Sequence, residues 1–256
     1  MDKTVSADAR PTLRGSLAAA ALALAVLASV ALLLSGPGNR FGWWDYRMAF
    51  SIMAWAAWGG ATAALLSLAA LVWSMWRRAR RAIVLAMFGV LIGTATFGLP
   101  LQFRQRAAQV PPIHDISTDT DDPPRFVALL AARAGAPNGV EYGGEGVAAA
   151  QKRAYPDIVP LTLAVKPDVA LQQCAQAAAA LGWDIAAIAP TELRVEATDT
   201  TVFFGFKDDV VIRVSPAAQG SRVDIRSVSR LGRSDLGTNA RRIREFARKL
   251  RQLQAR

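Results

Sequence analysis

The polar side chains that could form a binding site are concentrated toward the C-terminus. Arg226 and Arg230 are four residues apart in a segment that alternates like a strand, so we expect both on one face of it. Asp235 and Asn239 follow near the predicted start of the last helix, whose N-terminal amides favour anions. The arrangement predicts a site for a phosphate, a carboxylate or a lipid head group, or alternatively an internal network of ion pairs and caps that fixes the strand–helix turn. The candidate binding residues are Asp208, Asp209, Arg213, Arg226, Arg230, Asp235 and Asn239.

Catalytic chemistry has less support. The single histidine, His114, is of a type used in general acid–base catalysis, but it lies in a predicted tether and no serine-nucleophile elbow accompanies it. Asp119, Asp121 and Asp122 offer oxygens for calcium, yet the glycine and glutamate of a dedicated calcium loop are missing, which favours a solvated acidic turn or a helix cap. The pair Asp208–Asp209 is expected to form a turn as well. We assign no catalytic residue and expect no metal and no cofactor.

The composition of the chain changes near Leu101. Residues 1–101 contain 9 Lys and Arg against 3 Asp and Glu, whereas residues 102–256 contain 21 against 17. Most of the net charge of +10 therefore lies beside apolar segments, where it indicates membrane topology rather than nucleic-acid binding. The one cysteine, Cys174, excludes an internal disulfide and a cysteine-based zinc site, so the second part must be stabilised by its core.

Three apolar segments, at about 17–35, 49–75 and 82–101, are long enough to cross a bilayer as helices. A cleaved signal peptide is the alternative for the first one, but its apolar run is longer than usual and no convincing cleavage site follows. Their middle parts carry no charged residue, which favours a membrane anchor over a transport pathway. We expect residues 1–106 to form the membrane region.

The cations beside these segments predict the orientation. Positively charged loops favour the cytoplasmic side, and seven cations lie on the side of the N-terminus against four on the other. We therefore expect a multi-pass protein of the inner (cytoplasmic) membrane with a cytoplasmic N-terminus and a periplasmic C-terminal domain. The seven are Lys3, Arg10, Arg14, Arg77, Arg78, Arg80 and Arg81, and the four are Arg40, Arg47, Arg104 and Arg106.

A tether is predicted at 107–124 and a soluble domain at 125–256. Hydrophobic patterning predicts an α+β fold in which sequential antiparallel strands carry helices on one face, similar to a helix-grip arrangement. The arginines of the last helix are expected to form a solvated basic face, with contact to lipid head groups as the alternative. Strands are predicted at 161–165, 183–188, 193–206, 210–214 and 222–228, helices at 125–130, 167–181 and 239–253, and a loop at 134–146.

Several short motifs, in order over about residues 112–253, resemble the family known as domain of unknown function 1499. The resemblance implies a domain boundary and candidate positions, and it implies no activity. The motifs are IHDISTD at 113–119, YPDI at 155–158, FKDDVVIRV at 206–214, DIRSVSRLG at 224–232 and DLGTNARRIR at 235–244.

Three functional hypotheses follow from the sequence. The first is a membrane-anchored envelope protein whose outer domain binds a ligand, a lipid or a protein. The second is an enzyme acting on an envelope lipid or polysaccharide, which requires Asp208, Asp209 or His114 to meet in one cleft. The third is an accessory subunit that uses its apolar helices as the interface. Membrane lipids and a membrane protein are the expected partners, and nucleic acid is not.

Overall fold

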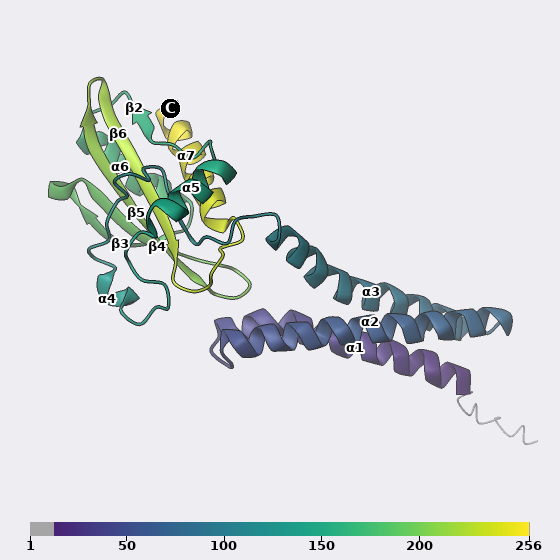
Figure 1. The fold of residues 1–256 in the computed structure, drawn as a ribbon. Coiled ribbons are helices and arrows are strands. Elements are labelled where there is room, and N and C mark those ends of the chain that lie inside the picture. Colours follow the sequence, from purple (N-terminus) through teal and green to yellow (C-terminus); the bar gives the residue numbers. More distant parts are fainter. Residues whose placement is uncertain (1–12, 256) are drawn as a thin grey trace, which may run out of the picture. The chain divides into compact units, whose positions relative to one another are not determined.

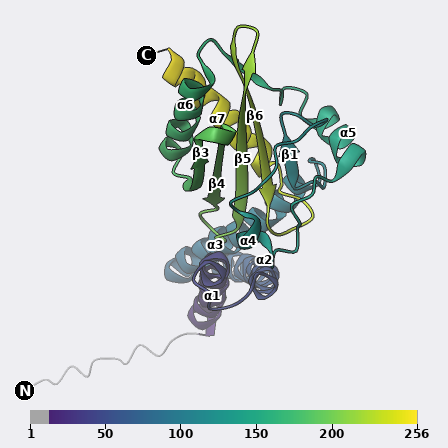
Figure 2. The same cartoon turned by 90° about the vertical axis from the view of Figure 1, so that its left-hand side faces the viewer.

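The computed structural model describes residues 13–255, which divide into two compact units with the boundary in the chain between Gln105 and Arg106. The first unit consists of long apolar helices and the second is built around an antiparallel sheet (Figures 1 and 2). The α+β class predicted from the sequence is confirmed. Lys3 and Arg10, used above for the orientation, lie outside the described residues, as does the side chain of Arg14.

The helices of the first unit are α1 (Leu13–Arg40), α2 (Tyr46–Trp76) and α3 (Arg80–Ala107). Each is long and apolar enough to cross a membrane. Asp45 caps α2, because its Oδ1 accepts a hydrogen bond of 2.8 Å from the amide of Met48. Each helix is longer than the predicted apolar segment, since the polar residues that flank the segment are helical as well.

Small residues form the contacts among these helices, and large apolar residues point away from them. A Cβ added to Gly93 would lie 2.7 Å from the carbonyl oxygen of Gly60, so the α2 and α3 backbones approach closely. Conversely, Leu27, Trp55 and Leu65 are 67%, 78% and 69% exposed. Such outward-facing apolar surface is what a helix presents to lipid.

The sheet of the second unit has the strand order β1-β6-β5-β4-β3, with β2 pairing to the other end of β6. All the pairings are antiparallel. β5 and β6 form the long central hairpin, since Gly220 with its positive φ of 100° allows the tight turn. The strands are β1 (Asp115–Ser117), β2 (Leu161–Leu163), β3 (Asp184–Ala189), β4 (Arg194–Thr200), β5 (Lys207–Ala217) and β6 (Gly220–Ser229).

Two helices, α6 (Pro167–Ala180) and α7 (Thr238–Gln254), cover one face of the sheet (Figure 2). The 3-10 turn η1 (Pro190–Glu192) connects β3 to β4. Two shorter helices complete the unit. α5 (Gly144–Ala154) packs beside β1 through Gln151. The side-chain oxygen of Gln151 accepts a hydrogen bond from the N–H of Ser117, and its side-chain nitrogen donates one to the Ser117 carbonyl. α4 (Leu130–Arg133) lies on the opposite face.

The layer between the sheet and its two long helices is filled with side chains. Trp183 and Phe246 stack with ring centroids 5.7 Å apart, and Ile212, Ile225 and Leu250 are fully buried around them. Large buried rings thus occupy the space between the sheet and these two helices.

Several local predictions are wrong because distant residues decide the structure. Residues 115–117 of the predicted tether form β1, and Asp208 and Asp209 lie inside β5 rather than in a turn. The predicted loop at 134–146 gives way to α5 at its end. Residues 125–129 are not helical, because the Glu196 carboxylate accepts hydrogen bonds from the amides of residues 127–129. The predicted strand 193–206 ends at Thr200.

Candidate functional site

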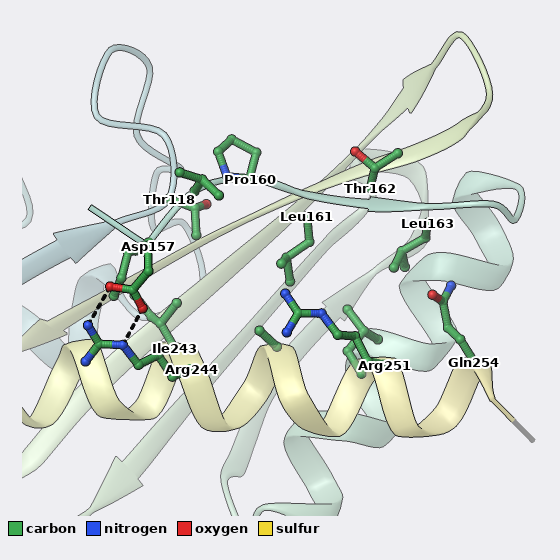
Figure 3. A pocket seen from close by; sticks show the side chains of 14 residues that line it. Thr118, Asp157, Pro160, Leu161, Thr162, Leu163, Ile243, Arg244, Arg251 and Gln254 are labelled. Atoms are coloured by element: carbon green, nitrogen blue, oxygen red, sulfur yellow. Dashed lines mark hydrogen bonds and ion pairs between the residues drawn. The ribbon is translucent and has the colours of Figure 1, made fainter. Parts of the chain in front are cut away.

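A groove lies between α7 and the segment at 157–163, with a volume of about 350 Å³ (Figure 3). Its position follows from β2, which pairs with β6 and thereby places this segment alongside α7. Leu163, Ile243 and Leu250 form its apolar floor and are themselves nearly buried. We refer to this feature as the α7 groove.

Two arginines of α7 line the groove, and they differ in whether an acidic side chain neutralises them. Arg244 is neutralised by Asp157, which it meets with two hydrogen bonds of 2.6 and 2.7 Å. These bonds lower the pKa of Asp157 below its ordinary value. Arg251 is exposed, and no ion pair of its side chain is found in the described part of the chain. In Figure 3 its guanidinium points toward Leu161, across the groove. The groove thus combines an apolar floor with one cation available to a ligand.

The structure divides the sequence-predicted binding residues among separate networks and does not bring all of them into one site. Side chains alternate along a strand, so Asp208 points toward α7 while Asp209 points to the opposite face. Arg226 and Arg230 lie on the face of Asp209, as alternation predicted, and this places them away from the start of α7. The convergence required by the anion-site prediction is not found among these residues, and the two carboxylates named in the enzyme hypothesis, Asp208 and Asp209, point to opposite faces of the sheet.

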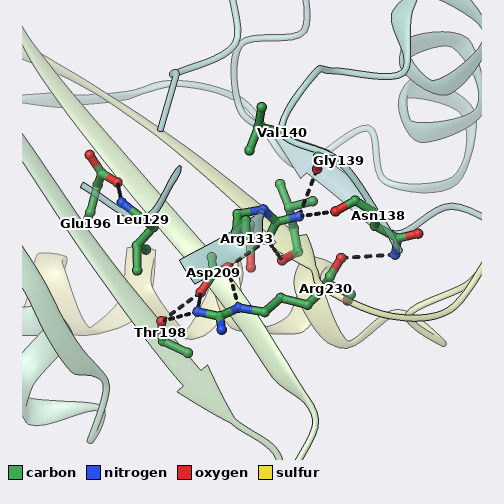
Figure 4. A network of polar contacts seen from close by, with 12 residues as sticks. Leu129, Arg133, Asn138, Gly139, Val140, Glu196, Thr198, Asp209 and Arg230 are labelled. Carbon is green, nitrogen blue, oxygen red and sulfur yellow. Dashed lines mark hydrogen bonds and ion pairs between the residues drawn. The ribbon is translucent and has the colours of Figure 1, made fainter. Parts of the chain in front are cut away.

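Asp209 is the centre of the first network (Figure 4). Its carboxylate accepts hydrogen bonds from Arg133 at 2.7 Å, from Arg230 at 2.8 Å to each oxygen, and from Thr198 at 2.7 Å. The side chains of Asp209 and Arg133 are completely buried. Burial alone would raise the pKa of Asp209, but the bonds from Arg230, Thr198 and Arg133 hold it below its ordinary value. The carboxylate is fully occupied by protein donors.

Arg226 is the centre of a second buried network. It forms a two-pronged ion pair with Asp115, at 2.9 and 2.7 Å, and donates to the carbonyls of Pro124 and Val140. Its guanidinium also lies over the ring of Phe126, 5.5 Å from the centroid. Because Asp115 belongs to β1 and the other partners belong to loops, this arginine holds the polypeptide before α5 against the sheet.

A third network joins Arg213 to the acidic segment that was considered for calcium. Arg213 and Arg222 both reach Asp119, at 3.2 and 2.7 Å, and both also contact Asp224. Asp122 pairs with Arg213 at 2.7 Å. The Asp119 side chain accepts hydrogen bonds from the backbone amides of residues 121 and 122. The segment is therefore a turn, the interpretation that the sequence favoured. Arg213 and Arg222 thus pair with Asp119 and Asp122, whereas Asp121 pairs with Lys152.

The fourth network caps and anchors α7. The Asp235 carboxylate accepts hydrogen bonds from the backbone amides of Gly237 and Asn239, both at 2.8 Å. Arg242 bonds Asn239 and reaches Asp208 at 2.6 Å. The amides near the helix start are therefore used by Asp235, which is the capping alternative stated above. Burial raises the pKa of Asp235, so these two amides compensate its desolvation only in part.

Arg242 corrects the expectation of a uniformly solvated basic helix. It is 3% exposed, whereas Arg241, Arg244 and Arg248 are exposed. Sequence reasoning also missed Arg133 and Glu196, both buried and both central to loop packing. In the sequence, each is a charged residue at a position where the hydrophobic pattern allows either exposure or burial. A partner distant in the chain decides which of the two occurs.

Comparison with known proteins agrees with the motifs seen in the sequence. The model of the family described as Protein of unknown function (DUF1499) matches residues 115–250. No curated protein matches the chain. The match begins at β1 and ends within α7, so it covers the sheet with both of its long helices and leaves the three apolar helices outside. The chain belongs to the DUF1499 family.

Proposed function

We propose that this protein is a membrane-anchored binding protein whose α7 groove takes an anionic amphiphile, that is, an apolar chain ending in a carboxylate or a phosphate. The observation that carries the proposal is the groove itself, with its apolar floor and the exposed Arg251 beside it. A volume of about 350 Å³ lies within the range of about 300–1,000 Å³ typical of small-molecule sites.

The lining of the groove favours an amphiphile over a wholly polar ligand. Leu161 and Leu163 point toward α7, where Ala247 also lines the groove, and Gln254 adds a neutral polar group near the end of the helix, whereas Thr162 points away from α7 (Figure 3). A polar metabolite would leave the apolar wall uncovered, and a neutral hydrocarbon would leave Arg251 without a counter-charge. An acyl chain with an anionic end matches both features.

Membrane anchoring is supported by the outward-facing leucines and tryptophans of α1, α2 and α3. Exposing so large an apolar surface to water is unfavourable, whereas the hydrocarbon chains of lipids solvate it. The arginine loop after α2 favours the cytoplasm, and this supports the proposal that the sheet unit lies on the periplasmic side of the inner membrane.

Thiol labelling tests this orientation. Burial raises the pKa of the Cys174 thiol to about 12, so the native cysteine is expected to stay unmodified. In intact cells, a membrane-impermeant maleimide should label a cysteine placed at Ala218, in the exposed β5–β6 turn, and should not label one placed at Arg78. After lysis both positions should react. Labelling of position 78 alone in intact cells would reverse the orientation.

Photo-crosslinking tests the groove. The full chain is placed in nanodiscs of zwitterionic lipid and given a fatty acid that carries a photoactivatable diazirine. We expect cross-links to peptides covering 157–163 and 243–254, identified by mass spectrometry. Arg251→Ser should lower this cross-linking about threefold, the size expected for one exposed ion pair. Ala247→Trp should abolish it, because the indole would fill the floor.

Arg248→Ser is the matched control, since Arg248 is an exposed arginine on the same helix that does not line the groove. It should leave the cross-linking unchanged. Cross-links confined to α1–α3, or an equal loss in the Arg248 and Arg251 variants, would show that the probe merely partitions into lipid or follows net charge, and the groove would lose its proposed role.

A further inference from the structure

The turn between β4 and β5 exposes apolar side chains at one end of the sheet. Residues 201–206 read TVFFGF, and Val202 and Phe203 are 86% and 41% exposed. Behind them Phe204 stacks on Phe206 with ring centroids 5.0 Å apart, and Phe203 meets Phe204 edge-on at 4.9 Å. The rings support one another, so the turn holds its apolar tip outward.

The loop between β6 and α7 lies at the same end. The amide of Arg230 donates to the carbonyl of Lys207 at 3.0 Å, which joins the two loops at their bases. This second loop contributes Leu236, 37% exposed, and the exposed Arg233. Figure 1 shows both loops at one end of the sheet. We call the set Val202, Phe203, Lys207, Arg233 and Leu236 the tether-end surface.

The chain that leaves α3 enters the sheet unit at this end. The amide of Asp235 donates to the carbonyl of Ile113 at 3.0 Å, and the Ser234 hydroxyl lies 3.4 Å from the carbonyl of Pro111. Residues 108–110 are thus all that separates Ala107, the last residue of α3, from the first residue held by this loop. An extended chain across that gap spans at most about 14 Å.

We propose that the tether-end surface docks on the lipid bilayer, with Val202, Phe203 and Leu236 in the interfacial layer and Lys207 and Arg233 against anionic head groups. The inference rests on the membrane anchoring proposed above. Lipid is the partner that fits, because the short tether keeps this end near the membrane and because apolar tips flanked by cations are what anionic interfaces bind. Docking would fix how the α7 groove is presented to the membrane.

A fluorescent label on the tip tests the docking. The full chain carrying Val202→Cys is labelled with nitrobenzoxadiazole and reconstituted into vesicles of phosphatidylcholine and phosphatidylglycerol. We expect emission shifted to the blue and quenched by nitroxide-bearing lipids. The same label at Ala218, at the far end of β5, should emit as in water and stay unquenched. Lys207→Ser with Arg233→Ser should reduce the quenching at position 202 and remove its dependence on phosphatidylglycerol.

A third label, at Leu65 in α2, separates the two proposals. Quenching at 65 with none at 202 would overturn docking and leave the anchor intact. No quenching at either position would overturn the anchor itself. A blue shift at 202 that depends on protein density and is insensitive to nitroxide lipids would mean that a second copy of the chain covers the surface, which also overturns docking on lipid.

Discussion

Replacing Asp209 with alanine is expected to destabilise the sheet unit by about 3–5 kcal/mol, the range for breaking a buried ion pair by removing one partner. The carboxylate neutralises two arginines, of which Arg133 has no exposed side-chain surface. Without it, the hydrogen-bond acceptors left to Arg133 among residues 13–255 are the carbonyls of Asn138, Gly139 and Val228. Repulsion between Arg133 and Arg230 adds to the loss.

Hydrogen–deuterium exchange of the full chain in detergent measures this effect on peptides from β5 and β6. Asp121→Ala is the matched control, because it also removes an aspartate paired with a cation, but the side chains of Asp121 and Lys152 are 88% and 60% exposed. That control should change protection by no more than about 1 kcal/mol. Equal protection of the Asp209 and Asp121 variants would contradict the central role of the buried network.

The stability of the sheet unit at acid pH provides a second test of the role of Asp209. Its pKa in the folded protein is held below the ordinary value of 3.8, so folding favours the ionised carboxylate. Its contribution is therefore complete well above the unfolded-state pKa of 3.8 and is lost as the pH falls through the lower, folded-state pKa. Below pH 4, protection of β5 should fall less steeply with pH in Asp209→Asn than in the unmodified protein, since the amide does not titrate.

Replacing Arg226 with methionine should cost a similar 3–5 kcal/mol, for the opposite reason. The substitution keeps much of the apolar contact with Phe126 but leaves the carboxylate of Asp115 buried without its cation. Since Asp115 is in β1, the loss should be greatest there and in the preceding residues. Exchange of the peptide covering 111–119 is the measurement.

A double substitution separates charge from packing. Arg226→Met combined with Asp115→Leu removes both charges, and we expect it to be more stable than Arg226→Met alone, because no unpaired buried charge is left. The carbonyls of Pro124 and Val140 still lose their donor, so recovery should be partial. If the double variant were as unstable as the sum of the two single variants, the ion pair would carry no coupling.

The parts of the fold predicted correctly are those whose signal is local. Apolar runs identified the three long helices, and the 3.6-residue pattern of α7 located that helix to within one residue at each end. Pro167 and Gly182 marked the limits of α6. Such features depend on neighbours in the chain, and the motifs that indicated the family are of the same local kind.

The errors have a common physical cause. β1 is three residues long and becomes a strand only because β6 offers it hydrogen-bonding partners more than a hundred residues away. Asp208–Asp209 has the composition of a turn, and arginines from α4, from the loop that follows β6 and from α7 neutralise the two carboxylates inside a strand. No local pattern carries information about such partners.

By itself, the sequence determined the three apolar helices, the α+β class and the family of the second unit, because hydrophobic periodicity and motif order are properties of the linear chain. Only the tertiary structure decided which charges are buried, that the seven candidate residues serve separate networks on two faces, and that α7 forms a groove with the segment at 157–163. A charged side chain has the same sequence signature in water and in a buried ion pair, since the counter-charge that permits burial is supplied by the fold.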